Sequence, residues 1–175
     1  CRCDPGYEIS GASCTACNKG TYKASSGNWP CTPCSPGTVL GYTAAALDDC
    51  QACPFHTYAS EDQSTCLACP MHSQTASSGS DSVSDCTCNA GYSGQDGETC
   101  TVCAAGTYED MQQHTCEACP ANSQSPAASD AATDCVCDAG YGGGDGESCV
   151  VCEAGKYENV VSHDCQTCPT GSQSP

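Results

Sequence analysis

Cysteine recurs along this chain at a fixed interval of 49 residues. Six cysteines return in the same order one interval later, Cys86, Cys88, Cys100, Cys103, Cys116 and Cys119 being followed by Cys135, Cys137, Cys149, Cys152, Cys165 and Cys168. Self-similarity at a fixed period is the signature of a tandem array of small units. The sequence therefore predicts repeats that are each held by disulfides.

Apolar side chains are too few to build a hydrophobic core. Val, Ile, Leu and Phe make up 13 of 175 residues, whereas 22 residues are Cys. With a formal charge of -17, the low hydrophobicity alone would predict disorder. This cysteine content instead marks a disulfide scaffold from an oxidising compartment. We expect small disulfide-rich repeats that form an elongated tandem array of irregular β-hairpins, almost without helix, at an extracellular or cell-surface location.

The repeat unit reads C-x-C-x2-G-Y-x7-C-x2-C-x2-G-x-Y-x7-C-x2-C-P and is followed by a Ser/Ala/Asp-rich loop. We assign repeat 1 to 1–49, repeat 2 to 50–85, repeat 3 to 86–134 and repeat 4 to 135–175. Repeat 2 is shortened, because it lacks the C-x-C-x2-G-Y hairpin, and repeat 4 is incomplete. Since the chain starts without Met and stops in mid-repeat, we expect a piece of a longer secreted protein.

The shortened repeat also indicates how the cysteines pair. It has lost two cysteines together with the segment between them, and the other spacings are kept, which is the behaviour of a self-closed loop. Sequence alone does not fix connectivity, but sequential pairing follows from this loss. The predicted bonds are Cys3–Cys14, Cys17–Cys31, Cys34–Cys50, Cys53–Cys66, Cys69–Cys86, Cys88–Cys100, Cys103–Cys116, Cys119–Cys135, Cys137–Cys149 and Cys152–Cys165, which leaves Cys1 and Cys168 over.

Local signals favour hairpins over helices. The dipeptides Asp96-Gly97 and Asp145-Gly146 are typical of type I′ hairpin turns between bonded cysteines. No stretch has sustained 3.6-residue apolar periodicity, so we expect no helix longer than a turn or two. Tyrosines recur at two places in the unit, where we expect their rings to pack beside disulfides, at Tyr7, Tyr92 and Tyr141, and at Tyr22, Tyr58, Tyr108 and Tyr157.

Metal binding is the strongest rival interpretation. The spacing C-x2-C-x12-C-x2-C would suit tetrahedral zinc at Cys100, Cys103, Cys116 and Cys119, and again in repeat 4. That assignment would leave Cys86 and Cys88 with neither a metal ion nor a disulfide partner. Asp96 with Glu98, and Asp145 with Glu147, leave calcium as a second alternative, although their ligand density is below that of an EF-hand. We predict no resident cofactor or metal. With no neighbouring carboxylate cluster, we expect solvated side chains for His56, His72, His114 and His163.

Charge and motifs exclude several functions. No Lys or Arg lies between Lys23 and Lys156, so the chain has no footprint for nucleic acid or anionic lipid. No apolar stretch approaches the ~18 residues of a membrane span. There is no G-x-S-x-G, H-E-x-x-H or phosphate-binding loop, so we predict no enzyme. Ser/Thr-rich loops suit O-linked glycans, for which we name Ser123, Ser125, Ser172 and Ser174.

The segments CAAGTYEDMQQHTCEACP and CEAGKYENVVSHDCQTCP resemble the ephrin-receptor-like cysteine-rich repeat, which is related to the modules of tumour necrosis factor receptors. The segment CTCNAGYSGQDGETC is similar to the closing hairpin of an EGF module. Such repeats occur in receptor ectodomains and in long surface or fibril proteins of algae and protists. The resemblance implies an elongated extracellular rod without enzymatic activity.

Two functions follow as hypotheses. The close identity of whole repeats favours a structural segment whose copies self-associate, as a homo-oligomer or filament. The alternative is a receptor-like or adhesive ectodomain that binds a protein or carbohydrate ligand, most plausibly through the atypical repeat 2 with Phe55, His56 and Met71.

Overall fold

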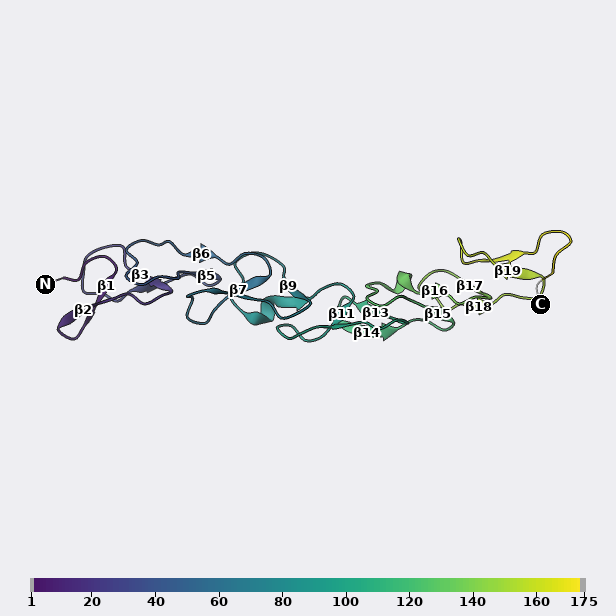
Figure 1. Ribbon diagram of the computed structural model, residues 1–175, viewed down its shortest axis with the longest axis horizontal. Helices are drawn as coiled ribbons and strands as arrows, with labels where there is room; N and C mark the ends of the chain where they lie inside the picture. The colour runs from purple at the N-terminus through teal and green to yellow at the C-terminus, as the bar shows by residue number, and fades with distance from the viewer. Residues whose placement is uncertain (1, 174–175) are drawn as a thin grey trace. The chain divides into compact units, whose positions relative to one another are not determined.

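The computed structural model describes residues 2–173 and consists almost wholly of short β-hairpins (Figure 1). Within these residues, twenty strands pair with their sequence neighbours to give ten two-stranded sheets. Helix in this range is limited to two 3₁₀ turns, η1 (Val83–Asp85) and η2 (Ala132–Asp134). The predicted class of disulfide-rich hairpin repeats is confirmed.

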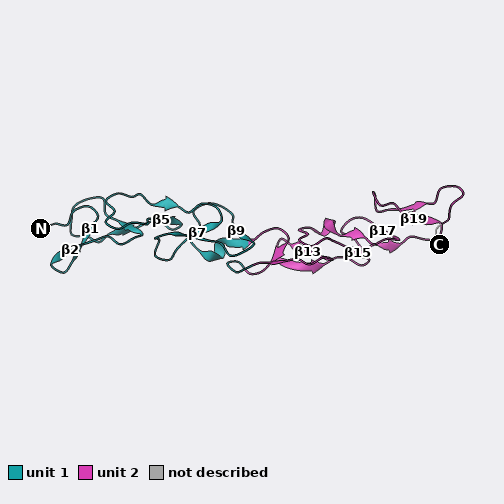
Figure 2. Cartoon of the chain, viewed as in Figure 1, with its two compact units in different colours: residues 1–87, 96–99 teal, residues 88–95, 100–175 magenta. Residues whose placement is uncertain are grey.

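The chain divides into two compact units (Figure 2). Unit 1 comprises residues 1–87 and 96–99, and unit 2 comprises residues 88–95 and 100–175. The strands that begin in unit 1 are β1 (Tyr7–Ser10), β2 (Ser13–Ala16), β3 (Thr21–Tyr22), β4 (Thr32–Pro33), β5 (Thr38–Val39), β6 (Gln51–Ala52), β7 (Thr57–Ala59), β8 (Cys66–Ala68), β9 (Ser73–Thr75) and β10 (Cys86–Cys88). Those of unit 2 are β11 (Tyr92–Ser93), β12 (Thr101–Val102), β13 (Thr107–Asp110), β14 (Thr115–Ala118), β15 (Ser123–Gln124), β16 (Val136–Cys137), β17 (Tyr141–Gly142), β18 (Val150–Val151), β19 (Lys156–Glu158) and β20 (Cys165–Thr167).

Ten disulfides staple these hairpins, and they join the same pairs that the sequence predicts. The bonds are Cys3–Cys14, Cys17–Cys31, Cys34–Cys50, Cys53–Cys66, Cys69–Cys86, Cys88–Cys100, Cys103–Cys116, Cys119–Cys135, Cys137–Cys149 and Cys152–Cys165. Each loop closes over 11 to 17 positions of sequence. Among residues 2–173, Cys168 is outside a disulfide. Cys1, the other cysteine left over by the pairing, lies outside the described residues.

A repeated turn explains why each C-x2-G-T or C-P-x2-S segment leads into a strand. A hydroxyl donates to the carbonyl three residues earlier, as from Thr107 to Ala104 and from Ser123 to Pro120. The residue before the hydroxyl has a positive φ, which Gly106 adopts without strain and Asn122 tolerates. This hydroxyl-closed turn thus sets the entry of the following strand, as in β13 and β15.

The expected type I′ turns are wrong. A type I′ turn needs a positive φ at both central residues, and here only Gly97 and Gly146 have one, not Asp96 or Asp145. The reason is a longer loop that folds back onto the chain. The N–H of Gly97 donates to the carbonyl of Cys86 at 2.8 Å, and Gly146 makes the equivalent bond at 2.9 Å.

Sulfur takes the place of a hydrophobic core. Most of the buried apolar side chains are cystines, and the single buried cluster, found in unit 1 among the described residues, consists of Cys34, Leu40 and Ala45. Tyr22 packs against this cluster, which confirms the predicted role for that ring. Desolvation of the Tyr22 hydroxyl, together with the charge of Asp48, raises its pKa.

Candidate functional site

The best-defined recurrent feature of this chain is a set of backbone hydrogen bonds that we call the clasp. In each clasp, a connecting segment crosses the edge of a hairpin and hydrogen-bonds to a buried cysteine and to the residue after the repeated tyrosine. A glycine with positive φ lies beneath the segment. The clasps hold the connecting segment of one disulfide loop against the hairpin of the preceding loop.

The first clasp lies in repeat 1. The Ala44 N–H donates to the Cys17 carbonyl, and the Lys23 N–H donates to the Ala45 carbonyl, both at 2.9 Å. Beneath them Gly6 has φ +79, and a methyl group there would overlap the Ala44 carbonyl oxygen. Because no L-residue fits this close approach, glycine is required at position 6.

The second clasp joins repeat 1 to repeat 2. The Gly79 N–H donates to the Cys53 carbonyl at 2.7 Å, and the Ala59 N–H donates to the Ser80 carbonyl at 2.9 Å. The glycine beneath is Gly37, where a methyl group would overlap the Gly79 carbonyl oxygen, just as one on Gly6 would overlap that of Ala44. The same device therefore occurs in the shortened repeat, where the glycine comes from the preceding copy.

The third clasp lies in repeat 3. The Ala128 N–H donates to the Cys103 carbonyl at 2.8 Å, and the Glu109 N–H donates to the Ser129 carbonyl at 3.0 Å. Gly91, with φ +78, lies under the Ala128 carbonyl. In all three clasps the first residue of the segment has a positive φ, of 59° at Ala44, 80° at Gly79 and 64° at Ala128.

The side chain that enters the clasp differs from copy to copy. Lys23 is 1% exposed in the first clasp, and its Nζ donates to the carbonyls of Tyr7 at 2.5 Å and Gly27 at 2.6 Å. The same ammonium lies 5.4 Å from the Trp29 ring centroid, within cation–π range. A buried positive charge thus ties the first hairpin to the loop that carries Trp29.

In the third clasp a carboxylate takes this place. Glu109 is 3% exposed, and its Oε2 accepts from the Gly91 N–H at 2.8 Å. Its Oε1 lies 3.0 Å from His114 Nδ1. The expectation of a solvated side chain is therefore wrong for His114, because the β13–β14 turn brings its imidazole back over Glu109. His163 Nδ1 likewise lies 3.5 Å from Glu158 Oε1.

Sequence reasoning missed Lys23 and Glu109 as clasp residues. The signal for the acidic pair was present, since Glu and His recur together as Glu109 with His114 and as Glu158 with His163. His56 and His72, in contrast, are exposed, although all four histidines share a positive φ.

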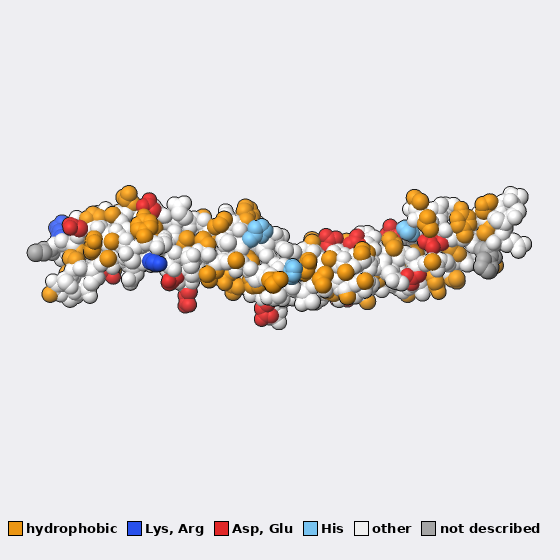
Figure 3. All heavy atoms as spheres, in the orientation of Figure 1, with side chains coloured by type: hydrophobic (Ala, Val, Ile, Leu, Met, Phe, Trp, Pro, Cys, Tyr) orange, Lys and Arg blue, Asp and Glu red, His pale blue; other side chains and the backbone are white. Residues whose placement is uncertain are grey.

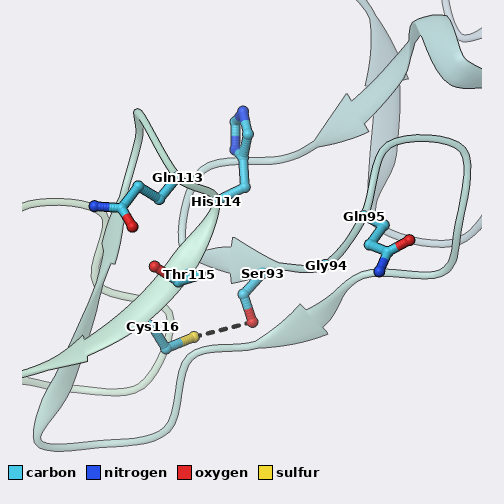
Figure 4. Close-up of a pocket in the computed structure, with 7 residues that line it drawn as sticks. All are labelled: Ser93, Gly94, Gln95, Gln113, His114, Thr115 and Cys116. Atoms are coloured by element: carbon cyan, nitrogen blue, oxygen red, sulfur yellow. Dashed lines mark hydrogen bonds between the residues drawn. The ribbon is translucent and has the colours of Figure 1, made fainter.

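A shallow hollow lies beside the third clasp, between the loop after β11 and the start of β14 (Figure 4). The Ser93 hydroxyl donates to Cys116 Sγ at 3.1 Å on its floor, while Gln95 and Gln113 lie at its rim. The His114 imidazole is the one ionisable group in the lining, and the other lining groups do not titrate. The hollow therefore has the character of a surface depression and not of a catalytic site.

The zinc interpretation is wrong. Cys100, Cys103, Cys116 and Cys119 belong to three different disulfides, so their sulfurs are not available as thiolates. Among residues 2–173 there is no group of three or more His, Cys, Asp or Glu side chains that could hold a metal ion. Asp96 with Glu98, and Asp145 with Glu147, are not joined there by a third acidic ligand.

The serines named for glycans fall into different environments. Ser123 and Ser125 are 8% and 5% exposed, and their hydroxyls donate to the carbonyls of Pro120 and Thr107 at 2.8 Å. These two are therefore poor acceptors, because a glycan needs a free, accessible hydroxyl. Ser172 is exposed, and Ser174 lies outside the described residues.

Comparison with known proteins matches this architecture. The family described as tyrosine-protein kinase ephrin type A/B receptor-like matches residues 6–47 and 40–86. These residues form ephrin-receptor-like cysteine-rich repeats. The chain is 42% identical over 52 residues to human ephrin type-B receptor 6 and 39% identical over 51 residues to human ephrin type-A receptor 6. Each match covers 29% of the chain and 5% of the receptor.

The ephrin-receptor-like repeats and the ten disulfides point to an extracellular or cell-surface location. No helix within residues 2–173 has the length and apolar character needed to cross a membrane.

Proposed function

We propose that this chain is a structural segment of a secreted or cell-surface protein, an array that serves as a stiff spacer and self-associates into an extracellular filament or appendage. The supporting observation is the junction between repeats 1 and 2. It combines the Cys34–Cys50 bond, the second clasp and a 2.9 Å hydrogen bond from the Leu40 N–H to the Gln63 carbonyl. Covalent and backbone contacts at one joint restrict bending, as a spacer requires.

The junction between repeats 3 and 4 is built in a comparable way within unit 2. β15 pairs with β16 across it, and the Cys119–Cys135 bond closes the loop between them. The Asn122 side chain donates to the Cys149 carbonyl at 2.9 Å. Neighbouring repeats thus share a sheet instead of a flexible linker.

Self-association has a candidate surface in repeat 4. Val150 and Val151 on β18 and Val160 and Val161 in the β19–β20 turn are 65% to 86% exposed. Hydrophobic side chains gather over β19 in Figure 3. Exposed apolar side chains beyond isolated ones mark interaction surfaces, whereas the charge of -17 opposes association at low salt.

The experiment is to follow the mass of the purified chain by light scattering, and to image it by electron microscopy, as protein and salt concentrations rise. We expect assembly at high salt, and its loss in a Val160→Ser/Val161→Ser variant. Leu47→Ser, which changes an exposed apolar residue of repeat 1, is the control. A chain that stays monomeric under all conditions contradicts the filament.

A receptor-like or adhesive role is the second candidate, favoured by repeat 2. Phe55 and Met71 are 58% and 68% exposed on two turns that are joined by the 2.9 Å bond from the Cys69 N–H to the His56 carbonyl. Binding of the labelled chain to intact cells, lost in Phe55→Ser/Met71→Ser but kept in Leu47→Ser, would favour this role over the spacer.

We also propose O-glycans on the exposed connecting loops and no catalytic role. Ser77 and Ser78 are exposed in the loop of repeat 2, as is Ser172 in repeat 4. Mass spectrometry of the native protein should find sugar on these serines and none on Ser123 or Ser125. An unmodified mass for both loops contradicts the glycans.

A further inference from the structure

Tyr42 is the one tyrosine that the repeat pattern does not explain. The other seven occupy the two recurrent positions of the unit, whereas Tyr42 lies in a connecting segment, between Leu40 and Ala45. The connecting segments of repeats 2 and 3, residues 70–85 and 120–134, contain no Phe, Tyr or Trp. The unit therefore folds without an aromatic ring of this kind at this place.

The connecting segment of repeat 1 holds Tyr42 at the surface. Leu40 and Ala45, on either side of it, are buried in the cluster with Cys34. The Leu40 N–H also donates to the Gln63 carbonyl at 2.9 Å. Tyr42 itself is 48% exposed. Because both flanks of the segment are fixed, the phenol ring is presented to solvent and to other molecules.

The hydroxyl of Tyr42 has a carboxylate as its acceptor. It donates to Asp49 Oδ2 at 2.6 Å, and this bond, followed by desolvation and the charge of Asp49, raises the pKa of the hydroxyl. A short, charge-assisted bond of this kind gives the phenolic proton a defined destination. Tyr157, which is also exposed, bonds to the amide oxygen of Gln166 at 3.4 Å. Among residues 2–173, no other exposed tyrosine donates to a carboxylate.

We propose that Tyr42 is a site of oxidative cross-linking to Tyr42 of a second copy of this chain, with Asp49 as the proton acceptor. The oxidant is hydrogen peroxide acting through a peroxidase. Each phenol gives up one electron, its proton passes to Asp49, and a neutral tyrosyl radical remains. Two radicals form a bond between ring carbons adjacent to the C–O carbons, and the hydrogen on each of these carbons moves to the phenolic oxygen. The two electrons and two protons that were removed convert one peroxide into two water molecules.

The carboxylate favours oxidation over the addition of an anionic group to Tyr42. Sulfate or phosphate on the phenolic oxygen would remove the proton that Asp49 accepts and place a second anion beside it, which like-charge repulsion opposes. Oxidation, in contrast, needs an acceptor for that proton, and a base within hydrogen-bond reach accelerates proton transfer. The inference does not rest on filament formation, because two chains that collide in solution can couple.

The test oxidises the purified chain with hydrogen peroxide and a peroxidase, at a dilution at which light scattering shows the monomer. We expect a covalent dimer that survives reduction of the disulfides, shows dityrosine fluorescence and maps by mass spectrometry to a pair of Tyr42 peptides. Tyr42→Phe should abolish this dimer. Tyr157→Phe changes a tyrosine that is 41% exposed and should leave the dimer in place.

A second pair of variants tests the proton acceptor. Asp49→Asn keeps the shape of the side chain but replaces the base by an amide, so it should slow dimer formation about 10-fold or more. Added acetate, an external base, should restore much of the lost rate, which it would not do for a purely structural defect. Asp48→Asn removes the same charge one position earlier and should react like the unchanged chain. Absence of the dimer, cross-links shared equally among the exposed tyrosines, or an Asp49→Asn variant that is not slowed or not rescued overturns the inference.

Discussion

Glu109 accepts a hydrogen bond from the Gly91 N–H at 2.8 Å, although the two residues lie 18 positions apart in the sequence. The bond joins the acidic side chain of the third clasp to the glycine beneath that clasp. Since His114 holds the other carboxylate oxygen, one buried group connects the loop after Cys88 to the β13–β14 hairpin. The β11–β12 and β13–β14 hairpins of repeat 3 are thereby fixed to each other.

Replacing Glu109 by Ala should destabilise repeat 3. The change leaves the buried Gly91 N–H without its acceptor, and an unsatisfied buried group costs about 1–3 kcal/mol. Hydrogen exchange of the Gly91 amide, with disulfides intact, measures the effect directly. Glu117→Ala removes an exposed carboxylate from the paired strand and is the control. If both variants exchange alike, the carboxylate bond does not stabilise the clasp.

Gly91 and Gly106 provide a matched pair that isolates the clasp. Both have positive φ, of +78 and +81, but only at Gly91 would a methyl group overlap another backbone, that of Ala128. Alanine at either site costs about 1–2 kcal/mol for the left-handed conformation. We expect Gly91→Ala to cost about 1–3 kcal/mol more, as other overpacked sites do.

Denaturant unfolding of the two glycine variants measures this difference, and Gly140→Ala extends the series. Gly140 has φ +86 and no neighbour within 4 Å. Its alanine variant should therefore unfold like Gly106→Ala in this chain. A Gly91→Ala variant that is no less stable than these two would show that the close approach relaxes freely.

Much of the fold could be predicted from the sequence because its determinants are local. Each disulfide joins cysteines that are neighbours along the chain, so the loss of one loop in repeat 2 was enough to suggest sequential pairing. The clasps could not be predicted in this way. They are made by backbone groups of residues such as Ala44 and Ala128, whose side chains carry no signal, and by long loops that displaced the expected turns at Asp96-Gly97.

Lys23 should stabilise the first hairpin, β1–β2, whereas Lys19 should not. Hydrogen bonds to charged groups contribute about 1.5–3 kcal/mol, and Lys23→Ala removes those to Tyr7 and Gly27. Trp29 is the single tryptophan of the chain, so its fluorescence reports the loss of the ammonium 5.4 Å away. Lys19→Ala, at an exposed site, should change neither stability nor fluorescence. An unaltered Trp29 spectrum in Lys23→Ala contradicts the contact.

The carboxyl group of Asp62 should have a pKa below its ordinary value. The Ser60 hydroxyl donates to its Oδ1 at 2.7 Å and the Ser64 N–H at 3.1 Å, and these bonds lower the pKa of the carboxyl from 3.8. At a pH above the ordinary pKa of Asp62, the ionised carboxylate therefore stabilises the turn. This stabilisation is lost as the pH falls through the lower pKa of the folded state. In an NMR titration, Ser60→Ala should raise the Asp62 pKa, whereas Ser78→Ala should leave it unchanged.

Reduction should unfold the chain, because sulfur bonds replace the apolar core. With 22 cysteines and ten disulfides, alkylation without reductant should label no more than two residues per chain, one of them Cys168. After reduction, 13 Val, Ile, Leu and Phe residues cannot offset the entropy of 175 residues. Intact mass and the dispersion of amide NMR signals measure the two steps. A dispersed spectrum that survives full reduction would mean that side-chain packing, and not oxidised cysteine, holds the hairpins.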